Sequence, residues 1–151
     1  MILVTRLVAT HSDRPAGEQI ALRAERRLFL KRRWRGVAED GTEFGFDLES
    51  RLCSGGVIHR TERADWVVWQ EREPVIVLRP ATPEEAALMG WKLGNLHMPV
   101  EVLPDCLRVL PDPAVTQLLE REGWAFSEET VLFQPLKVAA HAVVPDAAGR
   151  E

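Results

Sequence analysis

The fold of the second half of this chain is decided by the stretch TPEEAALMGWKLGNLHMPV at residues 82–100. It opens as a capping box, because the Thr82 side chain can accept the backbone N–H of Glu85 and the Glu85 side chain can reach back toward the helix start. Pro83 occupies the first helical position, where its missing N–H has no partner to lose. The pattern predicts a helix over residues 83–93.

A lone histidine follows the end of this helix. Gly94 and Asn95 can supply the left-handed residue that ends a helix, and His97 lies just beyond them, before a strand predicted over residues 98–103. An imidazole at a helix end is well placed for exposure, so it can be presented to a metal ion or a partner. Spacing alone leaves open the alternative that His97 is a packed or solvated side chain.

The elements around this stretch predict a ferredoxin-like order. Asp112 and Pro113 repeat the cap-and-proline start for a second helix, which Gly123 ends. Strands are predicted over residues 75–79, 98–103, 107–110 and 130–134. The resulting β-α-β-β-α-β order builds a four-stranded antiparallel sheet with both helices on one face.

The first half of the chain predicts a small β module. Asp40 and Gly41 are a strong hairpin signal because the turn needs positive φ. Strands are predicted over residues 27–31, 33–38, 43–48, 57–59 and 65–71. We therefore predict an α+β chain made of an N-terminal small β domain at residues 1–74, a ferredoxin-like βαββαβ domain at residues 75–138 and a flexible tail at residues 139–151.

Composition and cysteine usage narrow the class of protein. The 151 residues are 46% hydrophobic and 28% charged, which is typical of a globular chain with a core. No apolar run approaches the roughly 20 residues of a membrane helix, and the start lacks a signal-peptide pattern. We therefore expect a cytoplasmic protein without a membrane partner. Cys53 and Cys106 have no metal-type spacing and are expected to be buried.

Charge is uneven along the chain. The net charge of −4 argues against a dedicated nucleic-acid binder. A basic strip nevertheless occupies positions Arg23, Arg26, Arg27, Lys31, Arg32, Arg33 and Arg35. This basic strip is either a docking surface for nucleic acid or protein, or a strand pair with charged outer faces whose acidic partners Asp40, Glu43 and Asp47 lie across the hairpin.

The histidine count limits what a single chain can bind. The four histidines, at positions 11, 59, 97 and 141, provide little material for a catalytic constellation, so we expect no enzyme. A nickel or zinc ion takes about four to six donors, and one imidazole supplies one of them. A twofold axis beside His97 would bring two imidazoles together. The metal hypothesis therefore predicts a symmetric homodimer, with Trp91, Leu93, Leu96 and Met98 either at its interface or in the helix core.

Three blocks of the sequence follow one another in the order and at about the spacing of a known family. They are residues 32–36 with 39–45 (RRWRG and EDGTEFG), residues 93–99 (LGNLHMP) and residues 133–135 (FQP). Together they resemble the UreE family of urease accessory metallochaperones, in which a Gly-Asn-Arg-His-x-Pro run carries the nickel-binding histidine. His97 occupies the position of that histidine.

The resemblance implies a function as well as a fold. It implies an N-terminal domain that contacts partner proteins and a C-terminal domain that binds metal and dimerises, with the two His97 residues meeting at the twofold. It further implies delivery of a nickel ion, with zinc or copper as substitutes, to the urease apoprotein in a complex with a partner GTPase. His141 in the tail is a second candidate ligand, and a tail histidine without a ligand role is the alternative.

Several positions depart from the family pattern. Lys92 and Leu96 replace a histidine and an arginine that often precede the metal-binding histidine, residues 111–113 (PDP) replace a His-Asp-His cluster, and Leu136 replaces a glutamate. We therefore expect about one strongly held ion per dimer. The departures also leave open a metal-independent interaction scaffold or assembly chaperone with the same fold.

Overall fold

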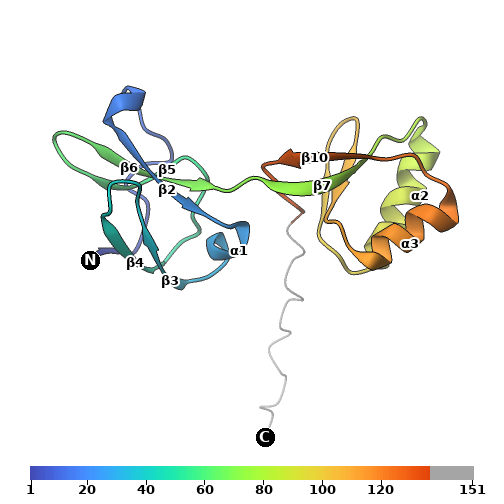
Figure 1. The fold of residues 1–151 in the computed structure, drawn as a ribbon, viewed down its shortest axis with the longest axis horizontal. Helices are drawn as coiled ribbons and strands as arrows, with labels where there is room; N and C mark the ends of the chain where they lie inside the picture. The colour runs from blue at the N-terminus through green and yellow to red at the C-terminus, as the bar shows by residue number, and fades with distance from the viewer. Residues whose placement is uncertain (137–151) are drawn as a thin grey trace, which may run out of the picture. The chain divides into compact units, whose positions relative to one another are not determined.

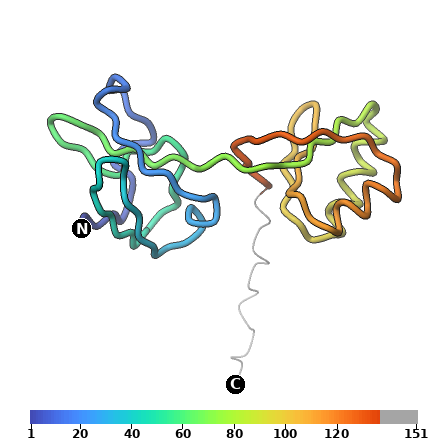
Figure 2. Tube along the Cα trace, in the orientation of Figure 1, coloured from blue at the N-terminus to red at the C-terminus, as the bar shows by residue number. Residues whose placement is uncertain are grey.

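The computed structural model describes residues 1–136, and the chain divides into two compact units at the boundary between Arg72 and Glu73. Unit 1 is Met1–Arg72, and unit 2 begins at Glu73. Strands predominate in unit 1, and unit 2 combines strands with two helices (Figures 1 and 2). The predicted α+β class is confirmed. Within residues 1–136, no helix has both the length and the apolar character needed to cross a membrane.

Unit 1 contains two three-stranded sheets. In one sheet, β4 (Glu43–Asp47) lies between β1 (Ile2–Val4) and β3 (Arg33–Val37), and in the other, β6 (Asp65–Gln70) lies between β2 (Gln19–Ala24) and β5 (Gly56–Arg60). The predicted hairpin is confirmed, since β3 and β4 pair antiparallel and Gly41 in their turn has φ 87°. Its left-handed backbone is why glycine is needed there.

The prediction of a strand over residues 27–31 is wrong. The segment forms a short helix, α1 (Arg26–Phe29), whose turn is closed by the N–H of Leu28 on the carbonyl of Glu25 at 2.9 Å. This turn packs the neighbouring side chains of Leu28 and Phe29 against the same core, whereas a strand would send neighbouring side chains to opposite faces. Tertiary burial of one phenylalanine therefore overrides a β-prone sequence.

Two strands of unit 1 were not predicted, and the predicted burial of Cys53 is wrong. Both β1 and β2 join their sheets by parallel pairing, with β4 and β6 respectively, so their partners lie far away in the sequence. A short parallel strand carries no hairpin signal that a local pattern can reveal. Cys106 is buried as expected, but Cys53 is exposed.

A buried carboxylate holds the second sheet of unit 1. The side chain of Asp65 is fully buried, and its two oxygens accept from Arg60 Nε at 2.7 Å and Arg60 Nη2 at 2.8 Å. Ser12 Oγ donates to Oδ2 at 2.6 Å, and Arg14 Nε lies 3.2 Å from Oδ1. These contacts, with Arg60 the largest cause, lower the pKa of Asp65 well below its usual range. The carboxylate ties the segment before β2 to β5 and β6.

Replacing Asp65 with asparagine is expected to destabilise unit 1 by about 3 kcal/mol at neutral pH, because two arginines lose their charged acceptor. A carboxyl whose pKa is lowered by folding stabilises above its unfolded value of about 3.9 and loses that stabilisation as pH falls toward its folded value. The deficit should therefore shrink below about pH 4 in urea unfolding. The control is Asp13→Asn, since the Asp13 side chain is 90% exposed. An equal loss for both variants would refute the prediction.

Unit 2 has the predicted ferredoxin-like arrangement. Its sheet runs in the order β10-β7-β9-β8, formed by β7 (Glu73–Leu78), β8 (Val100–Val102), β9 (Leu107–Val109) and β10 (Ser127–Val131). The helices α2 (Pro83–Gly94) and α3 (Pro113–Glu122) cover one face of this sheet (Figure 1). Asp112 caps α3 by accepting the N–H of Ala114 at 2.8 Å, and Gly123 ends it with φ 67°.

The other face of this sheet is covered by the segment after β10. Phe133 is fully buried there against Val75, Val77 and Cys106. The last strand begins three residues earlier than the predicted start at residue 130. Pro74 lies inside β7 and not before it, which is tolerated because β9 pairs with β7 only from Ile76 to Leu78.

Candidate metal centre

The helix that leads to the candidate metal centre is fixed at its start by the predicted cap. Thr82 Oγ1 accepts the N–H of Glu85 at 3.1 Å, and Glu85 Oε2 accepts the N–H of Ala81 at 2.7 Å. Met89 and Leu93 are buried under α2 and hold it on the sheet. The direction in which α2 delivers the chain to His97 is therefore set by a cap at one end and by packing along its length.

His97 has the left-handed backbone that was predicted for Gly94 or Asn95. Asn95 is still right-handed, with φ −66°, and His97 has φ 55°, the only positive φ of a non-glycine residue within residues 1–136. The N–H of His97 closes this turn on the carbonyl of Gly94 at 3.1 Å. A left-handed residue with a Cβ costs about 1–2 kcal/mol. Such strain is concentrated at functional sites.

The imidazole of His97 is exposed, and an apolar surface of α2 lies just before it in the chain. Trp91 is 66% exposed and Leu88 is 44% exposed, one helical turn apart. Of the other interface candidates, Leu93 is buried, and Leu96 and Met98 pack against the core. Trp91 alone of the four is therefore available for an interface. Leu88 was missed, although its spacing of three from Trp91 is a usable signal.

Few other metal donors lie near one another. Within residues 1–136, no three His, Cys, Asp or Glu side chains are grouped as a metal site. His11 lies on the surface, with its Nε2 3.1 Å from Asp13 Oδ1. The ring centroid of His59 lies 5.1 Å from that of Trp66. His141 lies outside the described residues.

The side chain of Lys92, at a position where the family often has histidine, is ion-paired in the structure. Its Nζ donates to Glu122 Oε1 at the end of α3. The pair ties α2, two residues before its end, to the last residue of α3. Lys92 therefore has a structural partner and offers no lone pair to a metal in its ammonium form.

The last described residues return toward the candidate centre. The N–H of Leu136 donates to the carbonyl of Val100 at 2.8 Å, at the first residue of β8. Val100 follows His97 by three residues. The chain beyond Leu136 therefore starts beside the strand that leaves the histidine.

Comparison with known proteins agrees with this architecture. Residues 73–148 match the family model described as the UreE urease accessory protein, C-terminal domain. The urease accessory protein UreE of Bacillus cereus is 32% identical over 117 residues, which cover 76% of this chain and 78% of the relative. UreE of a Nostoc species is 31% identical over 138 residues, which cover 89% and 92%. The chain belongs to the UreE family of urease accessory proteins.

Proposed function

We propose that this protein is a nickel metallochaperone of urease maturation that holds its ion at a symmetric homodimer interface. The observation that carries the proposal is the exposed imidazole of His97 on a left-handed backbone directly after an apolar helix surface. Neutral imidazole is a good ligand for nickel, and zinc or copper can substitute for it. The protein performs no reaction on a substrate, since nickel is its cargo.

Two copies of the chain supply what one copy lacks. A single imidazole cannot hold a nickel ion, whereas a twofold axis at the end of α2 brings the two His97 rings together. The exposed side chains of Leu88 and Trp91 supply apolar area that such an interface can bury. Aromatic residues are enriched at interface cores, which supports Trp91 as the centre of the contact.

His141 is the second proposed ligand. It lies five positions after Leu136, so it can reach about 17 Å from that anchor when the chain is extended. Val100 lies three positions after His97, a separation that spans at most roughly 11 Å. The tail is therefore long enough to bring His141 to the His97 of its own chain.

A shell of two to four imidazoles leaves nickel positions open to water. This arrangement suits a carrier, because a recipient protein can add its own ligands before the donor lets go. The proposed recipients are the urease apoprotein and its accessory complex with a partner GTPase, in the cytoplasm. The domain at residues 1–74 is proposed to contact these partners, and residues 75–138 to bind metal and dimerise.

Nickel titration of the full chain with simultaneous light scattering tests the function. We expect a dimer and one tightly held ion for two chains. Binding should weaken as pH falls through the histidine range, because protons compete with the metal for the imidazole nitrogens. A monomer that binds no nickel, or a stoichiometry of one ion for each chain, would contradict the proposal.

The second candidate is a metal-independent scaffold or assembly chaperone of the same fold. The ion pair of Lys92 with Glu122 favours it, because this position then stabilises the helix pair instead of serving a metal. Chelation separates the two candidates. In this test, nickel is removed from the protein before it is mixed with the urease apoprotein, and nickel is then supplied separately. A scaffold should support urease maturation as well as before. A metallochaperone should lose its advantage over free nickel.

A further inference from the structure

A lysine lies close in the chain to the candidate metal centre, where a positive charge is unfavourable. Lys92 precedes His97 by five positions, and the chain between them is compact, because α2 ends at Gly94 and the next turn closes at His97. Five positions in a helix and such a turn cover roughly 8–10 Å. An uncompensated ammonium at this distance would repel a divalent ion at the imidazole.

The ammonium of Lys92 is neutralised by one carboxylate. Its Nζ is ion-paired with Glu122 Oε1, and Arg121 Nε lies 3.9 Å from the same oxygen. The side chains of Lys92 and Glu122 are only 26% and 21% exposed, whereas that of Arg121 is 70% exposed. Partly buried charges are screened less by salt than exposed ones. The charge of Lys92 is therefore cancelled by Glu122 and not by dissolved ions.

The position of Glu122 is unfavourable for its own helix. Glu122 is the last residue of α3, and Gly123 follows it as the C-cap. The carbonyl groups at a helix C-terminus carry partial negative charge, so a carboxylate there is destabilising. The presence of a glutamate at this position is better explained by the charge that it opposes than by the helix that carries it.

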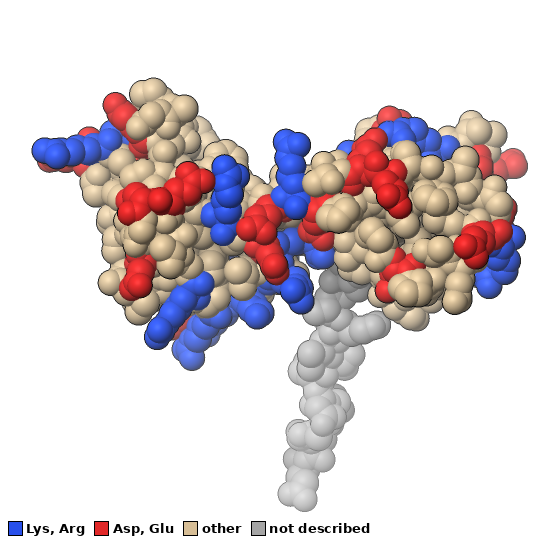
Figure 3. Space-filling view, in the orientation of Figure 1, with Lys and Arg blue, Asp and Glu red and all other residues tan. Residues whose placement is uncertain are grey.

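Every basic side chain in the described part of unit 2 lies beside a carboxylate. Residues 73–136 contain four Lys and Arg against ten Asp and Glu. Besides the lysine and arginine near Glu122, Arg79 pairs with Glu129 and Arg108 pairs with Glu101. In Figure 3, the basic side chains on the visible face of unit 2 lie beside acidic ones. Residues 73–136 therefore present a negative field that attracts cations.

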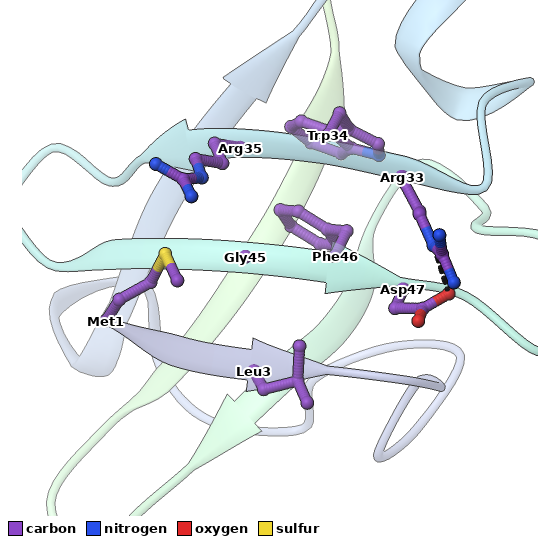
Figure 4. A pocket seen from close by; sticks show the side chains of 8 residues that line it. All are labelled: Met1, Leu3, Arg33, Trp34, Arg35, Gly45, Phe46 and Asp47. Carbon is purple, nitrogen blue, oxygen red and sulfur yellow. Dashed lines mark hydrogen bonds and ion pairs between the residues drawn. The ribbon is translucent and has the colours of Figure 1, made fainter.

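Unit 1 differs in this respect. Across its β3–β4 hairpin, Asp47 Oδ1 accepts from Arg32 Nε at 2.9 Å and Arg33 Nε at 3.2 Å, so the predicted pairing is confirmed for Asp47. Figure 4 shows the contact with Arg33. Arg35 on β3 lines a shallow groove of about 330 Å³ and has no carboxylate partner within residues 1–136. Neutralisation of every basic side chain is therefore particular to the described part of unit 2.

We propose that Glu122 keeps the His97 site accessible to a divalent cation by neutralising Lys92. This role of Glu122 rests on the proposed function and adds to it the charge that controls metal entry. At the proposed twofold, each nickel ion lies near two copies of the pair, so the effect of an uncompensated lysine enters twice. Glu122 holds the ammonium in place and cancels its charge, so it is a positioning residue and not a ligand.

The pair also ties α2 to α3, and a purely structural role predicts a different pattern. If the pair only holds the helices together, Lys92→Gln and Glu122→Gln should lower stability and change nickel affinity in the same direction. If the pair controls charge, nickel affinity should fall for Glu122→Gln, which leaves an ammonium, and rise for Lys92→Gln, which leaves a carboxylate. The sign of the affinity change therefore separates the two roles.

Calorimetric nickel titration of the full chain at 20 and 300 mM salt tests the proposal, with urea unfolding of the metal-free protein alongside. At low salt we expect Glu122→Gln to weaken nickel binding about tenfold and Lys92→Gln to tighten it severalfold, and both differences should shrink at high salt. The double variant should return to within about twofold of the unchanged protein, because both charges are then absent.

The matched control is Glu129→Gln. This variant removes one carboxylate from the ion pair of Arg79, in β10, at the opposite edge of the sheet from β8. It makes the same change in the net charge of unit 2 as Glu122→Gln. We expect it to change nickel affinity less than about twofold, because charges separated by more than a Debye length are largely screened.

Each contrary outcome has a distinct meaning. Weaker nickel binding in both single variants, or no change in either, would overturn the proposal and leave the nickel site itself in place. An equal effect of Glu129→Gln would show that only the net charge of unit 2 matters. Absence of nickel binding by the unchanged protein would refute the proposed function and this role of Glu122 with it. If Glu122→Gln unfolds unit 2, the Lys92→Gln result decides alone, since a loosened helix pair does not explain tighter binding.

Discussion

Replacing His97 with glycine is expected to abolish nickel binding at the proposed twofold and, at the same time, to stabilise unit 2. The imidazole is lost, so each dimer loses two ligands from a site that one chain cannot build alone. The backbone at this position has φ 55°, which glycine adopts without the penalty that a Cβ brings. The expected gain in the free energy of unfolding is about 1 kcal/mol.

Two further variants separate the imidazole from the backbone. His97→Asn keeps a residue type that tolerates the left-handed region, so it should lose nickel with little change in stability. His59→Asn is the control for loss of a histidine elsewhere, because the His59 ring packs beside Trp66 and is no part of the proposed site. Calorimetric nickel titration and thermal unfolding give the two readouts. Retained nickel affinity in His97→Gly would end the metal hypothesis at this residue.

His97→Gly is expected to lower nickel binding and to raise stability, and this opposition has a physical reason. A histidine that keeps a strained backbone is maintained by what its side chain does and not by what it contributes to folding. A purely structural role for His97 predicts the reverse, since glycine would then remove packing and lower stability. The stability measurement is therefore informative even before nickel is added.

The elements that the sequence predicts well are those whose signals are local. Thr82 and Asp112 cap their helices through bonds to residues two or three positions away, and Gly41 is required by a turn between adjacent strands. Such contacts are encoded in a few neighbouring residues, so the order of elements in unit 2 could be read from the chain. The ferredoxin-like sheet then follows from that order.

The features that the sequence missed depend on distant contacts. The segment at residues 27–31 becomes helical to bury Phe29, and β1 and β2 exist only through parallel partners elsewhere in unit 1. At the candidate metal centre, Gly94 and Asn95 were natural choices for the left-handed residue. Gly94 is instead the last helical residue, Asn95 keeps a right-handed backbone, and the turn closes at His97. A local propensity cannot show which of several neighbouring residues will carry the strain.

Replacing Phe133 with alanine is expected to destabilise unit 2 by about 3–5 kcal/mol, the range for truncating a buried phenylalanine. Phe133 is fully buried and covers the sheet face that α2 and α3 leave open. The cavity would lie against Val75 and Val77 in the central strand β7, which has little freedom to collapse because it is paired on both sides. Urea unfolding with hydrogen exchange in β7 measures the loss.

Phe126→Ala is the matched control for this variant. Phe126 also lies in unit 2, but its side chain is 50% exposed, so the same truncation should cost well under 1 kcal/mol. Comparable losses in both variants would show that burial of Phe133 is not what holds the sheet face closed.

Phe133→Ala also tests how the tail is anchored. Phe133 lies three residues before Leu136, whose N–H bonds to Val100 beside the strand that leaves His97. If this anchor sets where the tail begins, Phe133→Ala should weaken nickel binding through His141 while His97 itself is unchanged. Under conditions where both proteins remain folded, Phe133→Ala and His141→Ala should then lower nickel affinity by similar factors, and the double variant should show no further loss. Additive losses would instead mean that His141 finds the ion without guidance from the packed segment.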